Sequence, residues 1–228
     1  MSRTAARYAV AGALSATALL VACAGDEPAP SASTCGPGPS EEEERVLLDG
    51  TSETLDGWRM AGPGRFELQG DCSVRTVGGM GLLWYPEELG AYRLTLDWKT
   101  DGEDNSGVFV GFPDPGDDPW VAVEQGYEIQ IDASDHPDRT TGAVYGFQGA
   151  DVDARDAVLN PPGEWNTYLI EVQAPAITVS LNGVVVNRFR SDDPARDLTS
   201  GHVGLQNHGD RDTVFFRDVR VVDLAEGT

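Results

Sequence analysis

The sequence predicts an all-β domain built as a sandwich of two antiparallel sheets. Short segments in which apolar and polar residues alternate recur along it, with turn residues between them at intervals of roughly 8–12 residues. Asn182-Gly183 stands between two such segments and is typical of a two-residue β-hairpin. No segment beyond the N-terminal region has the periodicity of an amphipathic helix. These patterns favour the sandwich over a helical or mixed fold.

Residues 1–22 are expected to be a signal peptide of the bacterial lipoprotein type. Two arginines precede a short apolar run, which small residues close before Cys23. The segment Leu20-Val-Ala-Cys23 resembles a lipobox, in which the cysteine becomes the first residue of the mature protein and carries acyl chains. A membrane-spanning helix is the alternative, but the run is shorter than the roughly 20 residues that a bilayer crossing needs. We therefore expect a lipid anchor at Cys23 and a place in the cell envelope, outside the cytoplasm.

Residues 23–44 are expected to form a disordered linker between this anchor and the folded domain. They are rich in proline, serine, glycine and acidic residues and hold few large apolar side chains, so they cannot build a core. The following segment, residues 45–225, has the usual length of one all-β domain. We expect this domain to be a monomer.

The charge of the chain limits its partners. The formal net charge is −22 at pH 7, with 38 acidic residues against 16 basic ones. So acidic a protein repels the phosphate backbone of nucleic acids, and we expect no nucleic-acid partner.

Cys35 and Cys72 remain as a pair if Cys23 is lipidated. An even number of cysteines outside the cytoplasm predicts a disulfide, with two independent thiols as the alternative. Neither cysteine belongs to a pattern that binds a metal.

Alternation identifies the expected strands and sorts each into two faces. In residues 93–99, Leu94, Leu96 and Trp98 are expected to point inward, which leaves Lys99 on the polar face. The other expected strands are residues 106–112, 127–132, 167–172, 176–181, 202–208 and 213–219.

The polar faces of two of these strands carry side chains of the kinds that bind ligands or transfer protons. In residues 127–132 alternation places Glu128, Gln130 and Asp132 opposite the apolar residues, and in residues 202–208 it does the same for Gln206 and His208. Any antiparallel sheet with one wet face shows such alternation, and solvation alone is the alternative explanation. Carboxylates, amides and imidazoles are nevertheless a richer set than solvation requires. We expect the two strands to face one cavity, with Lys99 and Asn105 on its wall.

The strand of residues 106–112 suggests how a ligand could reach this face. Gly107 and Gly111 remove side chains and would let a ligand approach the backbone, while Phe109 between them offers a floor on which a sugar ring could stack. Acids, amides, an aromatic ring and open space suit a neutral polyhydroxylated ligand.

A set of short motifs also connects the chain with a known family. In chain order they are Leu47-Leu-Asp-Gly50 with Gly57-Trp58, Leu96-Asp-Trp-Lys99 with Asn105-Ser-Gly107, Gly126-Tyr-Glu-Ile-Gln-Ile-Asp132, Thr141-Gly-Ala-Val-Tyr145, Pro162-Gly-Glu-Trp-Asn166, Leu181-Asn-Gly183, Gly201-His-Val-Gly-Leu-Gln-Asn-His208 and Phe216-Arg-Asp-Val219. With these motifs in this order, the chain resembles the 3-keto-disaccharide hydrolase family over residues 46–224.

The resemblance implies a concanavalin-like jelly roll whose concave face binds sugar, often in a secreted lipoprotein. It also implies cleavage of glycosides whose sugar is oxidised at carbon 3. A ketone at C3 acidifies the proton on C2, so a base can remove it, the aglycone on C1 leaves by elimination, and water adds back. A carbohydrate-binding lipoprotein without catalysis is the alternative.

Position by position, the resemblance implies roles for individual residues. Glu128 and His208 would perform acid–base catalysis. Lys99 would supply a positive charge where the family has arginine, and Gly111 stands where a second arginine is expected. The residues expected to bind the substrate are Asn105, Phe109, Gln130, Asp132, Tyr145 and Gln206. The carboxylates on this face would also suit a divalent cation such as calcium, although the acidic segment 101–105 lacks the order of a calcium loop.

Overall fold

The computed structural model of the protein describes residues 35–36 and 44–224. The expected signal peptide, the lipidation site Cys23 and most of the expected linker lie outside these residues. Among the helices of the described part, none has the length and apolar character needed to cross a membrane.

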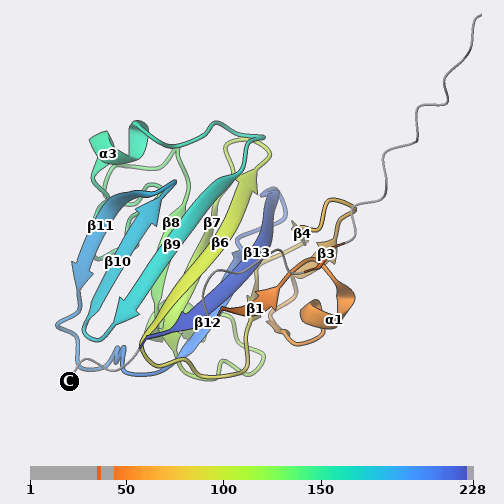
Figure 1. Ribbon diagram of the computed structural model, residues 1–228, viewed down its shortest axis with the longest axis horizontal. Helices are drawn as coiled ribbons and strands as arrows, with labels where there is room; N and C mark the ends of the chain where they lie inside the picture. Colours follow the sequence, from red (N-terminus) through yellow and green to blue (C-terminus); the bar gives the residue numbers. More distant parts are fainter. Residues whose placement is uncertain (1–34, 37–43, 225–228) are drawn as a thin grey trace, which may run out of the picture. The chain divides into compact units, whose positions relative to one another are not determined.

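The larger of two antiparallel sheets has eight strands and lies in front in Figure 1. Its strands, in spatial order, are β11 (Val184–Arg190), β10 (Ala176–Leu181), β9 (Asn166–Gln173), β6 (Tyr92–Thr100), β13 (Val214–Asp223), β4 (Val74–Val77) and β3 (Arg65–Leu68), and β1 (Arg45–Leu48) pairs with β13. The Asn182-Gly183 turn joins β10 to β11, as the sequence predicts.

The smaller sheet lies behind the larger one and has five strands. Its order is β2 (Arg59–Ala61), β5 (Gly81–Trp84), β12 (His202–Asn207), β7 (Ser106–Phe112) and β8 (Tyr127–Ile131). Three short helices complete the described part of the chain: α1 (Ser52–Leu55), α2 (Trp120–Gln125) and α3 (Val152–Asp156). The predicted two-sheet antiparallel sandwich is therefore confirmed.

The main core lies between the two sheets. Leu94, Leu96 and Trp98 of β6 alternate with polar residues and are at most 2% exposed, as predicted. Ile129 and Ile131 of β8 belong to the same cluster of buried side chains. Apolar burial between the inner faces therefore fixes which face of each strand points outward.

A second apolar cluster lies on the outer face of the five-stranded sheet, where helix α2 covers it. The cluster consists of Ala61, Leu82, Trp84, Phe109, Phe112 and Ala122, with Val123 packed against it. Phe109 pairs directly with Glu128 across β7 and β8, so the cluster shares a face with the polar side chains of β8. Helix α2 thus closes one part of this face and leaves the rest open.

Tertiary contacts hold α2 in place, since a helix of 6 residues is too short to be stable alone. The backbone N–H of Trp120 donates to Asp118 Oδ1 over 3.0 Å at the start of the helix. At its end, the guanidinium of Arg196 donates to the carbonyl oxygens of Val123 and Gly126.

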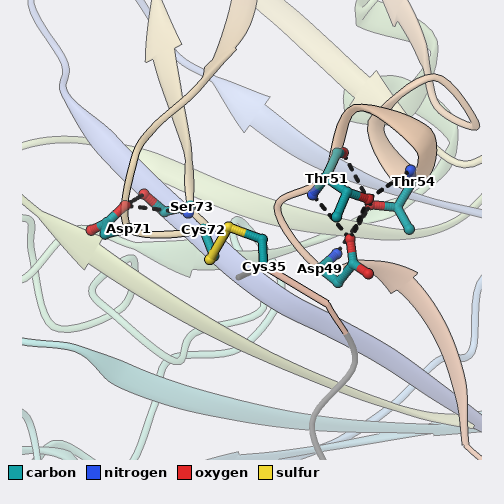
Figure 2. The surroundings of a disulfide bond; sticks show 7 residues. All are labelled: Cys35, Asp49, Thr51, Thr54, Asp71, Cys72 and Ser73. Carbon is teal, nitrogen blue, oxygen red and sulfur yellow. Dashed lines mark hydrogen bonds between the residues drawn. A yellow bond between two sulfur atoms is a disulfide. The ribbon is translucent and has the colours of Figure 1, made fainter. Parts of the chain in front are cut away.

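Cys35 and Cys72 form a disulfide, the pairing expected from their number. Figure 2 shows the bridge between two polar turns. In one, the hydroxyl of Ser73 donates to Asp71 over 2.6 Å, and in the other Thr51 and Thr54 donate to the carboxylate of Asp49. The bridge therefore ties the segment around residue 35 to the turn between β3 and β4.

Candidate functional site

A cavity of about 390 Å³ opens on the uncovered part of the outer face of the five-stranded sheet. Its lining consists of Met80, Asn105, Trp120, Val123, Glu128, Gln130, Tyr145, Gln206 and His208. Strand β8 and the end of β12 face this cavity together, as predicted, with β7 between them. The structure thus brings together six of the predicted residues, namely Asn105, Glu128, Gln130, Tyr145, Gln206 and His208.

A second cavity, of about 300 Å³, has a different lining. Trp98, Ile131 and Leu159 line it together with residues of three loops, and neither a histidine nor a buried carboxylate is among its described residues. Its chemistry therefore offers no acid–base group of the kind found in the first cavity.

Glu128 lies at the base of the candidate site and is only 9% exposed. Its side chain fills the space over Gly107 on the neighbouring strand. A Cβ atom on Gly107 would lie 2.3 Å from Glu128 Oε1 and 2.7 Å from its Cγ. Gly107 therefore makes room for the catalytic candidate, and the prediction that a ligand approaches the backbone there is wrong.

Burial changes the acidity of Glu128. Desolvation raises the pKa of its carboxyl group from 4.5 to about 8, and a hydrogen bond with Gln206 opposes part of that rise. A carboxyl group whose pKa lies near neutral pH can both accept and donate a proton under ordinary conditions, which is the property of a general acid–base group.

His208 is held by a carboxylate that the sequence analysis did not single out. Its Nδ1 lies 2.8 Å from Asp212 Oδ2, while Asp212 Oδ1 accepts the backbone N–H of Asn105 over 3.0 Å. With Nδ1 engaged by the carboxylate, Nε2 is the nitrogen left for a ligand. Asp212 lies in the loop after β12, so strand alternation gives no signal for it. The only sequence signal is its position four residues after His208.

Amide side chains line the same cavity as Glu128, and that of Gln206 hydrogen-bonds its carboxyl group. Gln130 Nε2 lies 3.5 Å from Asn105 Oδ1. The Oε1 atoms of Gln130 and Gln206 are buried and have no hydrogen-bond partner among the described residues. Unpaired buried acceptors are costly, so these two amides reduce the stability of the fold at this position.

Tyr145 lines another side of the cavity and contacts a positively charged residue outside it. Its side chain hydrogen-bonds Arg139, and this contact is the main cause that raises the pKa of the guanidinium. Sequence reasoning missed Arg139, which lies in a loop without alternation. No arginine or lysine is among the described residues that line the cavity itself.

The prediction that Lys99 lies on the cavity wall is wrong. Lys99 belongs to β6, in the eight-stranded sheet, and it points to the outer face of that sheet. Its Nζ lies 4.7 Å from the ring centroids of both Trp165 and Phe215, the latter on β13. Alternation placed Lys99 correctly on a polar face, but it could not show that this face belongs to the other sheet.

Two predicted binding residues also lie elsewhere. Phe109 is 2% exposed and packs against Phe112 beneath α2, so it offers no floor to a sugar. Strand β8 ends at Ile131, and the carboxylate of the next residue, Asp132, accepts hydrogen bonds from Ser134 and Asp135. Asp132 therefore stabilises a turn and does not line the cavity.

At Gly111 the left-handed backbone conformation disfavours the arginine expected from the family pattern. The backbone has φ +69°, and a Cβ atom would lie 2.7 Å from Leu198 Cδ2. The absence of a cation at position 111 is thus consistent with the positive φ of the strand there, which favours glycine.

The described residues contain no group of three or more His, Cys, Asp or Glu side chains placed to hold a metal ion. In the acidic segment 101–105, Asp104 accepts hydrogen bonds from the backbone of Asp101, Gly102 and Thr213. Its carboxylate therefore holds a turn together.

Comparisons with known proteins agree with this architecture. Residues 43–222 match the model of a family described as the 3-keto-alpha-glucoside-1,2-lyase-like domain. Among curated proteins none matches the chain.

Solved structures with a similar fold agree with the family match. One protein of Parabacteroides distasonis, named as a candidate glycosyl hydrolase, is 27% identical with a TM-score of 0.65, over 80% of this chain and 100% of its own. Another from the same organism, with the same description, is 21% identical with a TM-score of 0.67, over 82% of this chain and 99% of its own. A Bauhinia forficata lectin in complex with GalNAc is 8% identical, has a TM-score of 0.56 and covers 81% of this chain and 99% of its own, which shows the jelly-roll fold alone.

The raised pKa of Glu128 predicts a pH-dependent stability. The folded state holds the proton up to about pH 8 and the unfolded state only up to about 4.5, so this group's contribution is fully present below pH 4.5 and is lost as pH rises through 8. Glu128→Gln removes that loss. In urea unfolding from pH 5 to 9, the free energy of unfolding of the variant should rise relative to that of the wild type by about 1.4 kcal/mol per pH unit until about pH 8. A stability difference that does not change with pH would contradict the buried carboxyl group.

Proposed function

The chain belongs to the 3-keto-alpha-glucoside-1,2-lyase-like family, and from this premise we propose that it cleaves 3-keto-glycosides in the cavity around Glu128. Family membership implies a glycoside-related, hydrolase-like domain. The observation that supports the finer proposal is the buried carboxyl group of Glu128, with its pKa of about 8, among amide side chains. A carboxylate with a raised pKa is a stronger base than a solvated one, and a carbon acid next to a ketone requires such a base.

The proposed reaction begins at C2 of the oxidised sugar. The carboxylate of Glu128 takes the C2 proton, and the electron pair of that C–H bond forms the C2=C3 double bond of an enolate. When the enolate returns to the C3 ketone, the bond between C1 and the glycosidic oxygen breaks and a C1=C2 double bond forms. His208 donates a proton to the departing oxygen.

Water then completes the reaction by adding across the C1=C2 double bond, with its hydroxyl on C1 and a proton on C2. The net change is a 3-keto-glycoside plus water to a 3-keto-sugar plus the free aglycone alcohol. No oxidant or reductant is consumed in these steps.

Neutral hydrogen-bond donors would stabilise the enolate in this scheme. The amide groups of Asn105, Gln130 and Gln206 line the same cavity as Glu128, and Gln130 and Gln206 are themselves buried. Fixed donors in such surroundings stabilise a developing oxyanion more strongly than the same groups in water. This arrangement would replace the cations that the family pattern led us to expect at Lys99 and Gly111.

A carbohydrate-binding lipoprotein without catalysis is the second candidate function. The missing cations in the cavity lining and the lectin-like fold favour it. The amide side chains of Asn105, Gln130 and Gln206 on the cavity lining would then bind sugar hydroxyls without any reaction.

We expect Glu128→Gln to reduce kcat/KM for a 3-keto-glucoside by at least about 10³-fold, because the amide cannot accept the C2 proton. In the wild type, kcat/KM should rise with pH through an apparent pKa near 8, as the carboxylate form appears. Glu53→Gln, at an exposed position on α1, is the matched control and should leave both unchanged. A protein that binds the sugar but turns over no 3-keto-glucoside would instead be the binding lipoprotein.

The role of His208 can be tested with two leaving groups. A general acid matters most when the departing alcohol is a poor leaving group, so His208→Ala should slow cleavage of a methyl 3-keto-glucoside about 100-fold, and that of a 4-nitrophenyl one far less. Asp212→Asn should show the same pattern more weakly, since it disturbs the orientation of the ring. Equal losses for both substrates would contradict the acid role.

We also propose that Cys23 anchors the protein to a membrane through lipid. The support is the lipobox-like segment Leu20-Val-Ala-Cys23. Cys23→Ser should leave the precursor unprocessed or release the protein from the membrane fraction, as measured by fractionation and mass spectrometry of the N-terminus. A processed variant that stays in the membrane fraction would place the anchor elsewhere.

A further inference from the structure

The lining of the cavity divides into two chemically different parts. The hydrogen-bonding groups belong to Asn105, Glu128, Gln130, Tyr145, Gln206 and His208. The remaining wall, formed by Met80, Trp120 and Val123, offers none apart from the indole N–H. We call these three residues the apolar wall. A ligand that fills the cavity must therefore be polar at one end and apolar at the other.

Trp120 is the exposed part of this wall. Its side chain is 53% exposed, whereas Ala122 of the same helix is fully buried and Val123 packs on the apolar cluster. The helix therefore does not need the indole for its packing. Because both ends of α2 are fixed by hydrogen bonds, to Asp118 and from Arg196, the indole stands on a well-positioned base. A large apolar ring kept exposed at the mouth of a cavity points to a binding role.

The apolar wall continues to the loop that carries His208. A Cβ atom on Gly62 would lie 2.9 Å from both Met80 O and Pro119 Cγ, so the Met80 turn adjoins the start of α2. A Cβ atom on Gly79 would lie 3.7 Å from Asp210 Oδ1, in the loop between His208 and Asp212. Met80 therefore lies between the His208 loop and Trp120.

This order matches the order of groups in the substrate, which makes the inference rest on the proposed function. The sugar ring must place C2 at Glu128, where the amides can bind its hydroxyl groups. The glycosidic oxygen must lie near the proton donor His208. The group attached to that oxygen then continues along Met80 toward Trp120. A second sugar there would find almost no hydrogen-bond partners, whereas a flat apolar ring can stack on the indole.

We infer that the apolar wall is the aglycone subsite and that it selects glycosides with an aromatic aglycone by stacking on Trp120. The selectivity comes from contacts with the aglycone alone. It should therefore appear as a ratio between two substrates that share the same oxidised sugar and differ only in the group on C1.

The test compares phenyl and methyl 3-keto-glucosides. In Trp120→Ala the ratio of kcat/KM for the phenyl over the methyl substrate should fall about tenfold relative to the wild type, and Trp120→Phe should keep most of it. Leu68→Ala removes another exposed apolar side chain, 38% exposed, on β3 of the other sheet and outside the cavity lining, and should leave the ratio unchanged. An unchanged ratio in Trp120→Ala, with the melting temperature of each variant confirming a folded protein, would overturn the inference.

A failure of the proposed function can be distinguished from a failure of the aromatic subsite by a binding measurement. If the wild type turns over neither 3-keto-glucoside, calorimetric binding of unoxidised phenyl and methyl glucosides tests the subsite separately. Tighter binding of the phenyl compound that disappears in Trp120→Ala supports the aromatic subsite, whereas equal affinities in the wild type overturn it.

Discussion

The burial of one carboxyl group, that of Glu128, is the constraint on which the candidate site depends. A carboxyl group on the outer face of a sheet is ordinarily solvated and ionised. Here the missing side chain of Gly107 lets it lie against the neighbouring strand, and helix α2 covers the adjoining part of the same face. With water largely removed and one compensating hydrogen bond from Gln206, the neutral form is favoured. The same burial lowers the stability of the fold as pH rises from about 4.5 to 8, and it gives the carboxylate the basicity on which the proposed proton abstraction depends.

Helix α2 divides the outer face of the five-stranded sheet into two parts with different tasks. One part is an apolar cluster around Phe109 and is closed by the helix, while the other is the open cavity. Arg196 holds the end of the helix and also stacks on Phe147, at 4.9 Å from its ring centroid. The helix therefore supplies a fixed wall to the cavity, with Trp120 exposed upon it. Sugar and aglycone would meet the two chemistries that result, amides on one side and an apolar surface on the other.

The outer face of the eight-stranded sheet shows how the same alternation can serve structure alone. There the polar side chains of β6 pair with those of its neighbours, as in the contact of 3.1 Å between Arg217 and Asp97, or lie against aromatic rings, as Lys99 does. No strand of that sheet contributes to the cavity around Glu128. The position of the cavity thus follows from which sheet receives α2.

The sequence by itself determined the sandwich, the Asn182-Gly183 hairpin and the outward direction of Glu128, Gln130 and Gln206. Alternation with a period of two is a local property of the sequence, and burial of one face of the strand fixes which side chains point outward. Only the tertiary structure decided which outward faces meet. It placed Lys99 on the other sheet, covered Phe109 with α2, and joined the loop of Asp212 to the distant Asn105. Assignment of strands to sheets and docking of a short helix depend on contacts between distant segments, which no local pattern records.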